Sequence, residues 1–247
     1  MCGFVIISKP NENQNSDLIK LKKKFKHRGP DEQTLLFDNQ FSALFRKLNI
    51  TDSTNLSSQP FTNENKTIKL IFNGEIYNYK ELKKDLHNYG VKFKSKSDTE
   101  VILKLYEKIG LRFLNKIIGQ FSIVILDKNK KKIFFARDHL GQKPLYFYKQ
   151  NKSTFLSSEI KDIKFLVKKN LSFNEKSIVN FITHGISPID GNTFFEKIKL
   201  LEPGHLGIIE SGKLEIKKYW KLNIAQKKKL DISKLNYYLK KAFTRCL

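Results

Sequence analysis

Cysteine is nearly absent from this sequence, since only Cys2 and Cys246 occur in 247 residues. Two cysteines cannot build the dense disulfide framework of a small secreted protein, so we expect a cytoplasmic chain without disulfides. No apolar run approaches the roughly 20 residues that cross a bilayer. The short apolar stretch at residues 4–7 also lacks the basic flank of a secretory leader. The sequence therefore predicts a soluble protein that has no membrane partner.

Patterns for metal and nucleotide binding are missing as well. His27, His139 and His205 lie far apart, without the ligand spacing of a metal site, so no metal is expected. Neither a Walker-type loop nor the glycine fingerprint of a dinucleotide site occurs. We therefore expect no cofactor in this chain.

Acidic residues are scarce relative to basic ones, with 24 Asp and Glu against 47 Lys and Arg, and the formal net charge is +23. Such a charge raises the question of a nucleic-acid partner. The lysines are scattered, however, and their short clusters at residues 22–24, 130–132 and 227–229 have no interleaved aromatic residues. Runs of this kind are usually solvated surface. We predict no nucleic-acid partner, with a basic binding module as the alternative.

Short apolar or alternating stretches predict eight strands, at residues 4–8, 34–37, 42–45, 68–72, 121–126, 133–136, 145–148 and 154–156. Apolar residues at helical spacing lie between them, over residues 18–25, 82–89 and 101–106, and residues 97–100 supply cap-forming side chains where the last of these helices would begin. Neighbouring strands are often joined by short polar turns, which favours antiparallel sheets. The fold class predicted is α+β, with helices covering sheets.

The character of the chain changes after Ser157. Residues 159–167 and 175–183 predict helices, and residues 206–209 with 214–216 predict a hairpin. Near the end, an apolar stripe at helical spacing runs from Ile232 to Cys246 and is still present at the last residues. We expect this amphipathic helix to dock on another domain or subunit.

Cys2 follows the initiator methionine directly. Its side chain is small, so removal of Met1 is expected, and that leaves a free α-amine beside the thiol. An α-amine with a pKa near roughly 7.7 to 8.0 can accept and return a proton at neutral pH, so one residue would supply both nucleophile and base. Taken alone, a cysteine at position 2 is more often inert.

Asn73-Gly74 ends an apolar strand, where Asn-Gly is first of all a turn signal. An Asn amide and a Gly N–H presented together are also suitable donors for a tetrahedral oxyanion. Residues 27–31 and 137–146 place Gly and Pro turns among charged groups. There we favour structural ion pairs over a loop that shapes a substrate site.

Taken in order, ten segments resemble the class II glutamine amidotransferase domain of glutamine-hydrolysing asparagine synthetases, a branch of the N-terminal nucleophile hydrolases. These are residues 1–3, 27–31, 59–60, 73–78, 97–100, 119–121, 137–146, 157–161, 203–205 and 219–220. The resemblance implies a four-layer αββα sandwich of two mainly antiparallel sheets. It also implies hydrolysis of L-glutamine to glutamate and ammonia.

The resemblance further implies roles for individual residues. Cys2 would attack the glutamine carboxamide, the Asn73 side chain and the Gly74 N–H would hold the oxyanion, and the Cys2 α-amine would protonate the departing ammonia. Asp98 would pair with the substrate α-ammonium, and Glu75 would line the pocket.

Lys47 and Ile50 complete the predicted substrate-binding set, and Lys47 is a departure from the family pattern. It stands where the family has an arginine that grips the substrate carboxylate. A lysine keeps the charge but loses the two-pronged contact, so weaker glutamine binding is expected. The adjacent Arg46 would face the opposite side of the strand and replaces that arginine only if the register slips.

A second departure concerns domains. We expect a glutaminase domain at residues 1–210, and a linker with the first helix of a synthetase domain at residues 211–247. The Ser-Gly-Gly-x-Asp-Ser loop of that synthetase domain does not occur here. ATP and Mg²⁺ would belong to the missing domain, which would dock on the C-terminal helix, and a homodimer is possible. The alternatives are an amidotransferase subunit for another acceptor, such as a sugar acid of surface polysaccharide, and a catalytically degenerate remnant.

Overall fold

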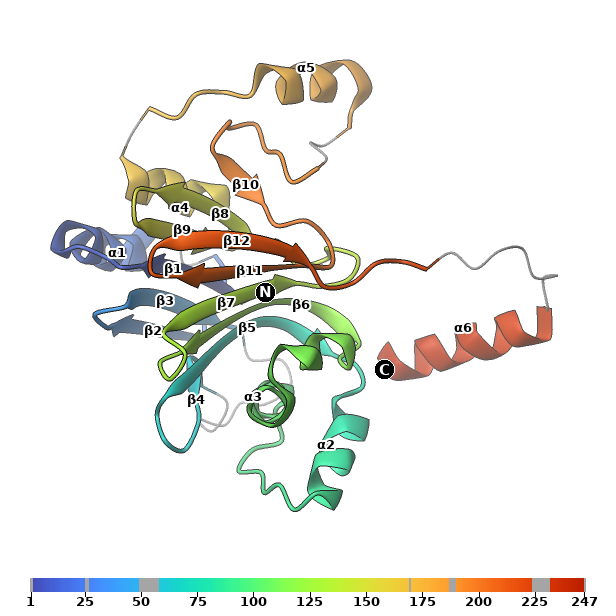
Figure 1. Ribbon diagram of the computed structural model, residues 1–247. Helices are drawn as coiled ribbons and strands as arrows, with labels where there is room; N and C mark the ends of the chain where they lie inside the picture. Colours follow the sequence, from blue (N-terminus) through green and yellow to red (C-terminus); the bar gives the residue numbers. More distant parts are fainter. Residues whose placement is uncertain are drawn as a thin grey trace.

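The computed structural model describes residues 2–24, 27–48, 58–168, 170–186, 190–223 and 232–246. Two six-stranded antiparallel sheets form its centre (Figure 1). The first has the strand order β10-β8-β9-β1-β3-β2, and the second has the order β12-β11-β7-β6-β5-β4.

The strands of the first sheet are β1 (Gly3–Ser8), β2 (Glu32–Phe37), β3 (Phe41–Lys47), β8 (Tyr146–Gln150), β9 (Ser153–Ser157) and β10 (Ile198–Leu200). Those of the second are β4 (Phe61–Thr62), β5 (Ile68–Ile76), β6 (Gly119–Asp127), β7 (Lys132–Arg137), β11 (His205–Glu210) and β12 (Lys213–Lys218). The helices are α1 (Glu12–Lys24), α2 (Tyr79–Asn88), α3 (Asp98–Ile109), α4 (Ile160–Val167), α5 (Glu175–His184) and α6 (Ile232–Cys246).

Three apolar cores separate the layers. Phe4 and Ile6 of β1 pack between the two sheets with Ile71 of β5. The alternate β1 residues Val5 and Ile7 face outward, because successive side chains of a strand point to opposite faces, and they pack on α1 and α4. The outer face of the second sheet is covered by α2 and α3. The four-layer α+β sandwich expected from the sequence is therefore confirmed.

Local sequence explains where α3 begins and ends. The Ser97 hydroxyl accepts a hydrogen bond from the Thr99 N–H at 3.1 Å, as the capping pattern predicts. Gly110 ends the helix with a φ of +59°, a conformation that glycine adopts without steric cost. The start of α3 is thereby fixed beside β5.

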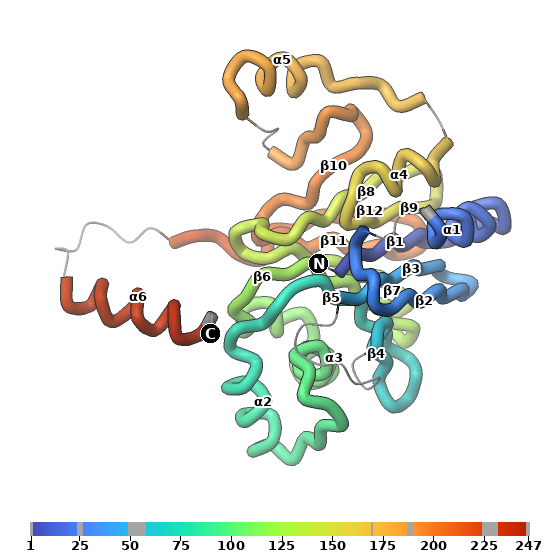
Figure 2. The backbone as a smooth tube through the Cα atoms, turned by 180° about the vertical axis from the view of Figure 1, so that it is seen from behind, coloured from blue at the N-terminus to red at the C-terminus, as the bar shows by residue number. Residues whose placement is uncertain are grey.

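Two helices stand away from the sheets. Both views of the backbone show α5 and α6 outside the four layers (Figures 1 and 2). Ile182 of α5 is 76% exposed, and Phe243 of α6 is 69% exposed. The apolar faces of α5 and α6 are thus open to solvent in this chain.

Among the described residues, no helix is both long enough and apolar enough to span a membrane.

All eight strands expected from the sequence are present, and pairing extends several of them by one to four residues. The sequence did not predict β4 or β10, which have two and three residues. The last strand, β12, pairs along its whole length with β11, so the second sheet continues past residue 210. The division of the chain into two domains stays a prediction.

Candidate active site

The thiol of Cys2 lies on the side of β1 that faces the other sheet. Cys2 packs against the core between the sheets, as Phe4 and Ile6 do. Its Sγ lies 3.4 Å from the Leu48 N, which donates to it, and 3.8 Å from the Leu48 O. The thiol is therefore held at the end of β3, and it is half-buried.

Lys47 and Arg46 face opposite sides of β3. Phe41, Ala43 and Phe45 pack between the sheets, so Lys47, two residues further, lies on the same face as the Cys2 thiol. Arg46 lies on the outer face, where its Nη2 donates to the Leu21 O at 3.2 Å and to the Lys22 O at 2.7 Å. The register has not slipped, so Arg46 does not take the place of Lys47.

Asn73 and Gly74 form part of a strand, which corrects the prediction of a turn. Both lie inside β5, paired with Ser122 and Phe121 of β6, and the turn follows at residues 77–78. The glycine is required by a close approach, because a Cβ at Gly74 would lie 2.1 Å from the Gln120 O. Long-range pairing with β6 has overridden the local turn preference of Asn-Gly.

Asn73 and Gly74 present two adjacent hydrogen-bond donors. Asn73 has the same strand parity as Ile71, which packs between the sheets. Within the described part of the chain, its buried Nδ2 has no hydrogen-bond partner. A buried amide without a partner is energetically unfavourable unless something binds to it, so the position is suited to a ligand.

The Gly74 N–H points to an edge of β5 where both neighbouring donors are taken. Alternate N–H groups of a strand point to the same side. The Phe72 N donates to Gln59 Oε1 at 2.6 Å, and the Ile76 N donates to Asp98 Oδ2 at 3.1 Å. β4 pairs with β5 at Lys69 and Leu70, before this point. The Gly74 N–H between them is therefore directed at an edge that β4 does not cover.

Asp98 is joined to the same strand edge from the start of α3. Burial is the main cause that raises its pKa, to about 6, while its hydrogen bonds with Ile76 and Thr99 act in the opposite direction. The negative charge of Glu75 adds to the rise. Glu75 itself is exposed at the end of β5. Glu75 thus follows the Asn73-Gly74 pair directly in the chain, and Asp98 reaches the same strand through its hydrogen bond with the Ile76 N.

Cys2, directly before β1, and Asn73 of β5 lie on opposite sheets whose strands β1 and β5 approach each other. Cα atoms of β1 and β5 come within 8 Å. This is closer than the roughly 10 Å at which two sheets usually pack. The structure thereby brings the elements that carry Cys2, Lys47 and Asn73 together on the faces between the sheets. Ile50 and Met1 lie outside the described residues.

The charged side chains at residues 137 and 138 bond mainly to backbone groups, which fits the structural role that the sequence favoured for residues 137–146. These contacts are hydrogen bonds to the backbone and not ion pairs. The Arg137 guanidinium donates to the Lys143 O at 2.8 Å, to the Leu201 O at 2.7 Å and to the Gly141 O. The Asp138 carboxylate accepts backbone N–H groups of the same turn, from residues 140, 142 and 143. These bonds fix the turn internally. Among the described residues, no cluster of His, Cys, Asp or Glu is arranged to hold a metal ion.

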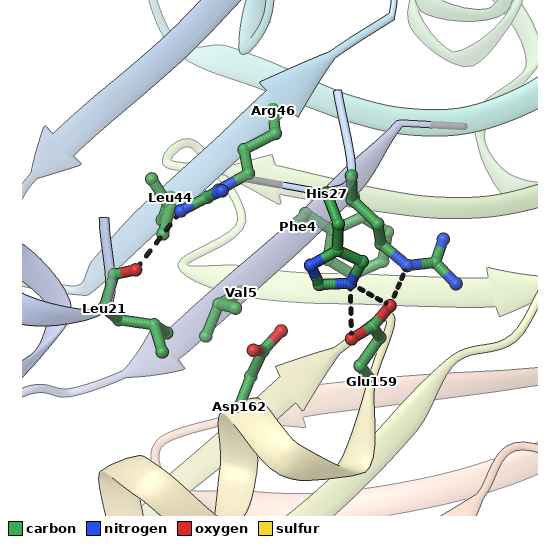
Figure 3. A pocket seen from close by; sticks show the side chains of 10 residues that line it. Phe4, Val5, Leu21, His27, Leu44, Arg46, Glu159 and Asp162 are labelled. Carbon is green, nitrogen blue, oxygen red and sulfur yellow. Dashed lines mark hydrogen bonds and ion pairs between the residues drawn. The ribbon is translucent and has the colours of Figure 1, made fainter. Parts of the chain in front are cut away.

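The structural ion pairs favoured at residues 27–31 are present on the outer face of β1, but the sequence did not reveal their partner, Glu159. His27 Nε2 lies 2.9 Å from Glu159 Oε1, and Arg28 Nε also donates to this carboxylate. Figure 3 shows His27 over Glu159, with Arg46 and Asp162 in the same pocket. The partners are 131 and 132 residues apart, so no local pattern could have revealed the cluster. The one available signal was that both segments carry the family resemblance.

A sequence model of the glutamine amidotransferase domain matches residues 1–220. The chain belongs to this family. Asparagine synthetase [glutamine-hydrolyzing] 2 of Bacillus subtilis (strain 168) is 42% identical over 183 residues, which are 72% of this chain and 24% of that protein. A putative asparagine synthetase [glutamine-hydrolyzing] 2 of Methanocaldococcus jannaschii is 34% identical, over 89% of this chain and 46% of that protein. The amidotransferase chain thus matches 24% and 46% of the length of these two relatives.

A solved structure supports the fold. The glutamine phosphoribosylpyrophosphate amidotransferase from B. subtilis superposes with a TM-score of 0.63, over 91% of this chain and 50% of that chain. Its sequence identity is 19%, so the likeness concerns the fold alone. The amidotransferase domain accordingly has the N-terminal nucleophile fold that the resemblance implied.

Proposed function

We propose that this chain hydrolyses L-glutamine to glutamate and ammonia, with the Cys2 thiol as nucleophile. Family membership supports the reaction class. The observation that carries the proposal is the pair of adjacent donors on β5. The Asn73 Nδ2 is buried without a partner among the described residues, and the Gly74 N–H points to the edge of β5 that β4 does not cover. Two such donors suit the developing oxyanion of acyl transfer.

The proposed reaction has two halves. After Met1 is removed, the Cys2 Sγ attacks the carboxamide carbon, and the oxygen takes up negative charge between Asn73 and Gly74. The C–N bond then breaks, the Cys2 α-amine returns the thiol proton to the nitrogen, and ammonia leaves a thioester behind. Water attacks the thioester and releases glutamate with the free thiol. Asp98 binds the substrate α-ammonium, Lys47 binds its carboxylate, and Glu75 and Ile50 line the pocket.

Glutamate release from glutamine tests this proposal directly. Wild-type protein should release glutamate and ammonia in equal amounts, and Cys2→Ala should abolish the release while retaining the wild-type melting temperature. Cys2→Ser, which keeps the shape but is a poorer nucleophile, should lose at least a hundredfold in kcat. The intact mass should lack Met1, because a retained methionine removes the free α-amine and overturns the mechanism.

We further propose that the ammonia serves asparagine synthesis from aspartate. The support comes from the names of the relatives, which favour this acceptor over another one. The same relatives are at least twice as long as the matched region, so a synthetase domain or subunit is the proposed partner. Its docking element in this chain is α6, where Ile232 and Tyr238 are 66% and 63% exposed.

A reconstitution tests the proposed partner. The chain is mixed with a synthetase polypeptide, glutamine, aspartate, ATP and Mg²⁺, and asparagine is measured. Ile232→Asp combined with Phe243→Asp should stop glutamine-dependent asparagine formation and leave glutamate release unchanged. Lys234→Gln on the same helix is the control, since it removes a charge from α6 and leaves these two side chains in place. Equal asparagine formation by both variants would exclude α6 as the docking element.

A further inference from the structure

The start of β1 is held by a segment far away in the sequence, the end of β9. The Ser158 N donates to the Phe4 O at 3.0 Å, and the Ser158 Oγ accepts from the Phe4 N at 3.2 Å. One residue therefore satisfies both backbone groups of Phe4. Chain termini are poorly ordered unless they are tied down, so this contact restrains the residues just before Phe4.

Arg28 restrains Cys2 itself. The Arg28 Nη1 donates to the Cys2 O at 3.2 Å, and the Nε of the same guanidinium donates to Glu159. Gly3 makes this possible, because a Cβ there would lie 2.8 Å from the Arg28 Cδ. The planar guanidinium thus links the Cys2 carbonyl to Glu159 across the outer face of β1, while the thiol points to the opposite face.

Glu159 is held in place by three side chains, those of Arg28, Lys161 and His27. Lys161 Nζ lies 2.7 Å from its Oε2, and His27 and Arg28 contact its Oε1. Burial alone would raise the pKa of Glu159, but the hydrogen bonds from Lys161, His27 and Arg28 outweigh burial and lower the pKa to about 2. The carboxylate is therefore ionised throughout the neutral range, and its grip on Arg28 is constant there.

We infer that Glu159 is a positioning residue for the nucleophile: through Arg28 it fixes the Cys2 carbonyl, and thereby the direction of the thiol. This inference rests on the proposed glutaminase function. The thiol is held at one point by the Leu48 N, and the carbonyl supplies the second point. A nucleophile held at both points stays aligned with the oxyanion donors, whereas small misplacements lower the rate steeply.

Glu159→Gln is the central test. It should lower kcat for glutamate release about tenfold and leave KM for glutamine within twofold, because alignment is lost and the pocket is kept. Alkylation of Cys2 by iodoacetamide should stay unchanged or become faster, since removal of a nearby negative charge favours the thiolate. A purely electrostatic role predicts equal or higher kcat, so the two measurements separate alignment from charge.

Arg28→Lys provides the second variant. Lysine keeps the charge but cannot donate to Glu159 and to the Cys2 carbonyl from two nitrogens of one plane. It should show the same loss in kcat, and the double variant should lose no more than either single one, as expected for residues that act through one contact. If the two losses multiply, or if Glu159→Gln keeps kcat within twofold, the inference is wrong.

Hydrogen exchange measures the restraint on the start of β1 independently of catalytic activity. Amides of the peptide that covers residues 2–8 should exchange faster in Glu159→Gln than in wild type. Glu64→Gln is the matched control, because it breaks the surface ion pair with Lys94 at 3.2 Å and should change neither exchange nor kcat. Unchanged exchange in Glu159→Gln overturns the inference, whereas wild-type protein that releases no glutamate overturns the proposed function.

Discussion

Lys47 is the residue at which this chain departs from the expected glutamine site. It lies at the end of β3, on the face shared with the Cys2 thiol and next to Leu48, which contacts the thiol. A side chain there is placed to reach a substrate bound at Cys2. Lysine offers a point charge, whereas arginine offers two parallel hydrogen bonds to a carboxylate.

Lys47→Arg should therefore lower KM for glutamine by roughly tenfold, which corresponds to about 1.4 kcal/mol of a stronger charged contact. Steady-state glutaminase assays measure the change, with kcat expected to stay within twofold. Lys94→Arg, at the exposed ion pair with Glu64, is the control and should leave KM unaltered. An unchanged KM in Lys47→Arg would remove Lys47 from the binding site.

The proposed pairing of Asp98 with the substrate α-ammonium predicts that glutamine binding depends on pH. Its pKa is raised by burial to about 6, so the carboxyl is neutral below this pH and cannot pair with an α-ammonium. KM for glutamine should rise about tenfold per pH unit below pH 6 and be flat above it. Asp98→Asn should have a high KM at every pH, without this dependence. A flat KM down to pH 5 in wild type would contradict the role of Asp98.

The raised pKa of Asp98 also means that ionisation of this carboxyl lowers the stability of the fold. The pKa of Asp98 in the folded state lies above its ordinary value of 3.8, so the ionised carboxylate destabilises the fold. This cost is fully present above about pH 6 and absent below 3.8. Asp98 is thus held at the site against a local preference for the neutral form, which is common at functional sites.

The positions of most strands along the chain and their antiparallel pairing could be predicted from apolar runs and turn spacing alone, whereas their order within each sheet could not. The details that create the site could not. Asn73-Gly74 has the local signature of a turn, yet β6 pairs with it and keeps it extended. The cluster of Arg28 with Glu159 depends on contacts between segments more than 130 residues apart. Such contacts leave no periodicity in the sequence, so sequence patterns cannot predict them.

The close approach of β5 and β6 at Gly74 gives a prediction about these strands. In Gly74→Ala the new Cβ would meet the backbone Gln120 O at 2.1 Å, which no side-chain rotation relieves. The strands must move apart, so the free energy of unfolding should fall by about 1–3 kcal/mol, and glutamate release should be lost. Urea denaturation measures the stability change.

A substitution on an exposed edge strand serves as the control for Gly74→Ala. Glu215 of β12 is exposed and pairs with Lys217 at the surface, so Glu215→Ala should change stability by less than about 0.5 kcal/mol. If Gly74→Ala changes the free energy of unfolding as little as Glu215→Ala does and still releases glutamate, the spacing between β5 and β6 is adjustable. The proposed dependence of the oxyanion donors on this spacing is then wrong.

At the scale of the whole molecule, α6 is set apart from the sandwich. Among the side chains that the structure describes, none from α6 belongs to the three apolar cores, and its Arg245 contacts Glu81 of α2 at 3.3 Å. By contrast, β12 completes an edge of the second sheet, and beyond it the Tyr219 hydroxyl donates to the Arg137 O at 2.7 Å. The sandwich therefore depends on residues 211–220 much more than on α6.

Two shortened chains test this difference. A chain ending at Asn223 should keep the melting temperature within about 1 °C of the full chain and keep its glutaminase activity. A chain ending at Glu210 lacks β12 and Tyr219, and it should melt at least roughly 5 °C lower. Equal melting of the two chains would show that residues 211–223 do not belong to the amidotransferase sandwich and would support a domain boundary at residue 210.

The hold of Ser158 and Glu159 on the first residues of β1 also orders events during synthesis. These contacts cannot form until the ribosome has made the chain through Glu159, which takes roughly 10–30 s at 5–20 residues per second. During this interval the N-terminus is accessible, so the proposed removal of Met1 has a window before folding encloses the new terminus. Removal of Met1 would then precede the contacts that fix Cys2. A mutation that speeds early folding would reduce the fraction of chains that lose Met1, and thereby lower activity, although it lies outside the site.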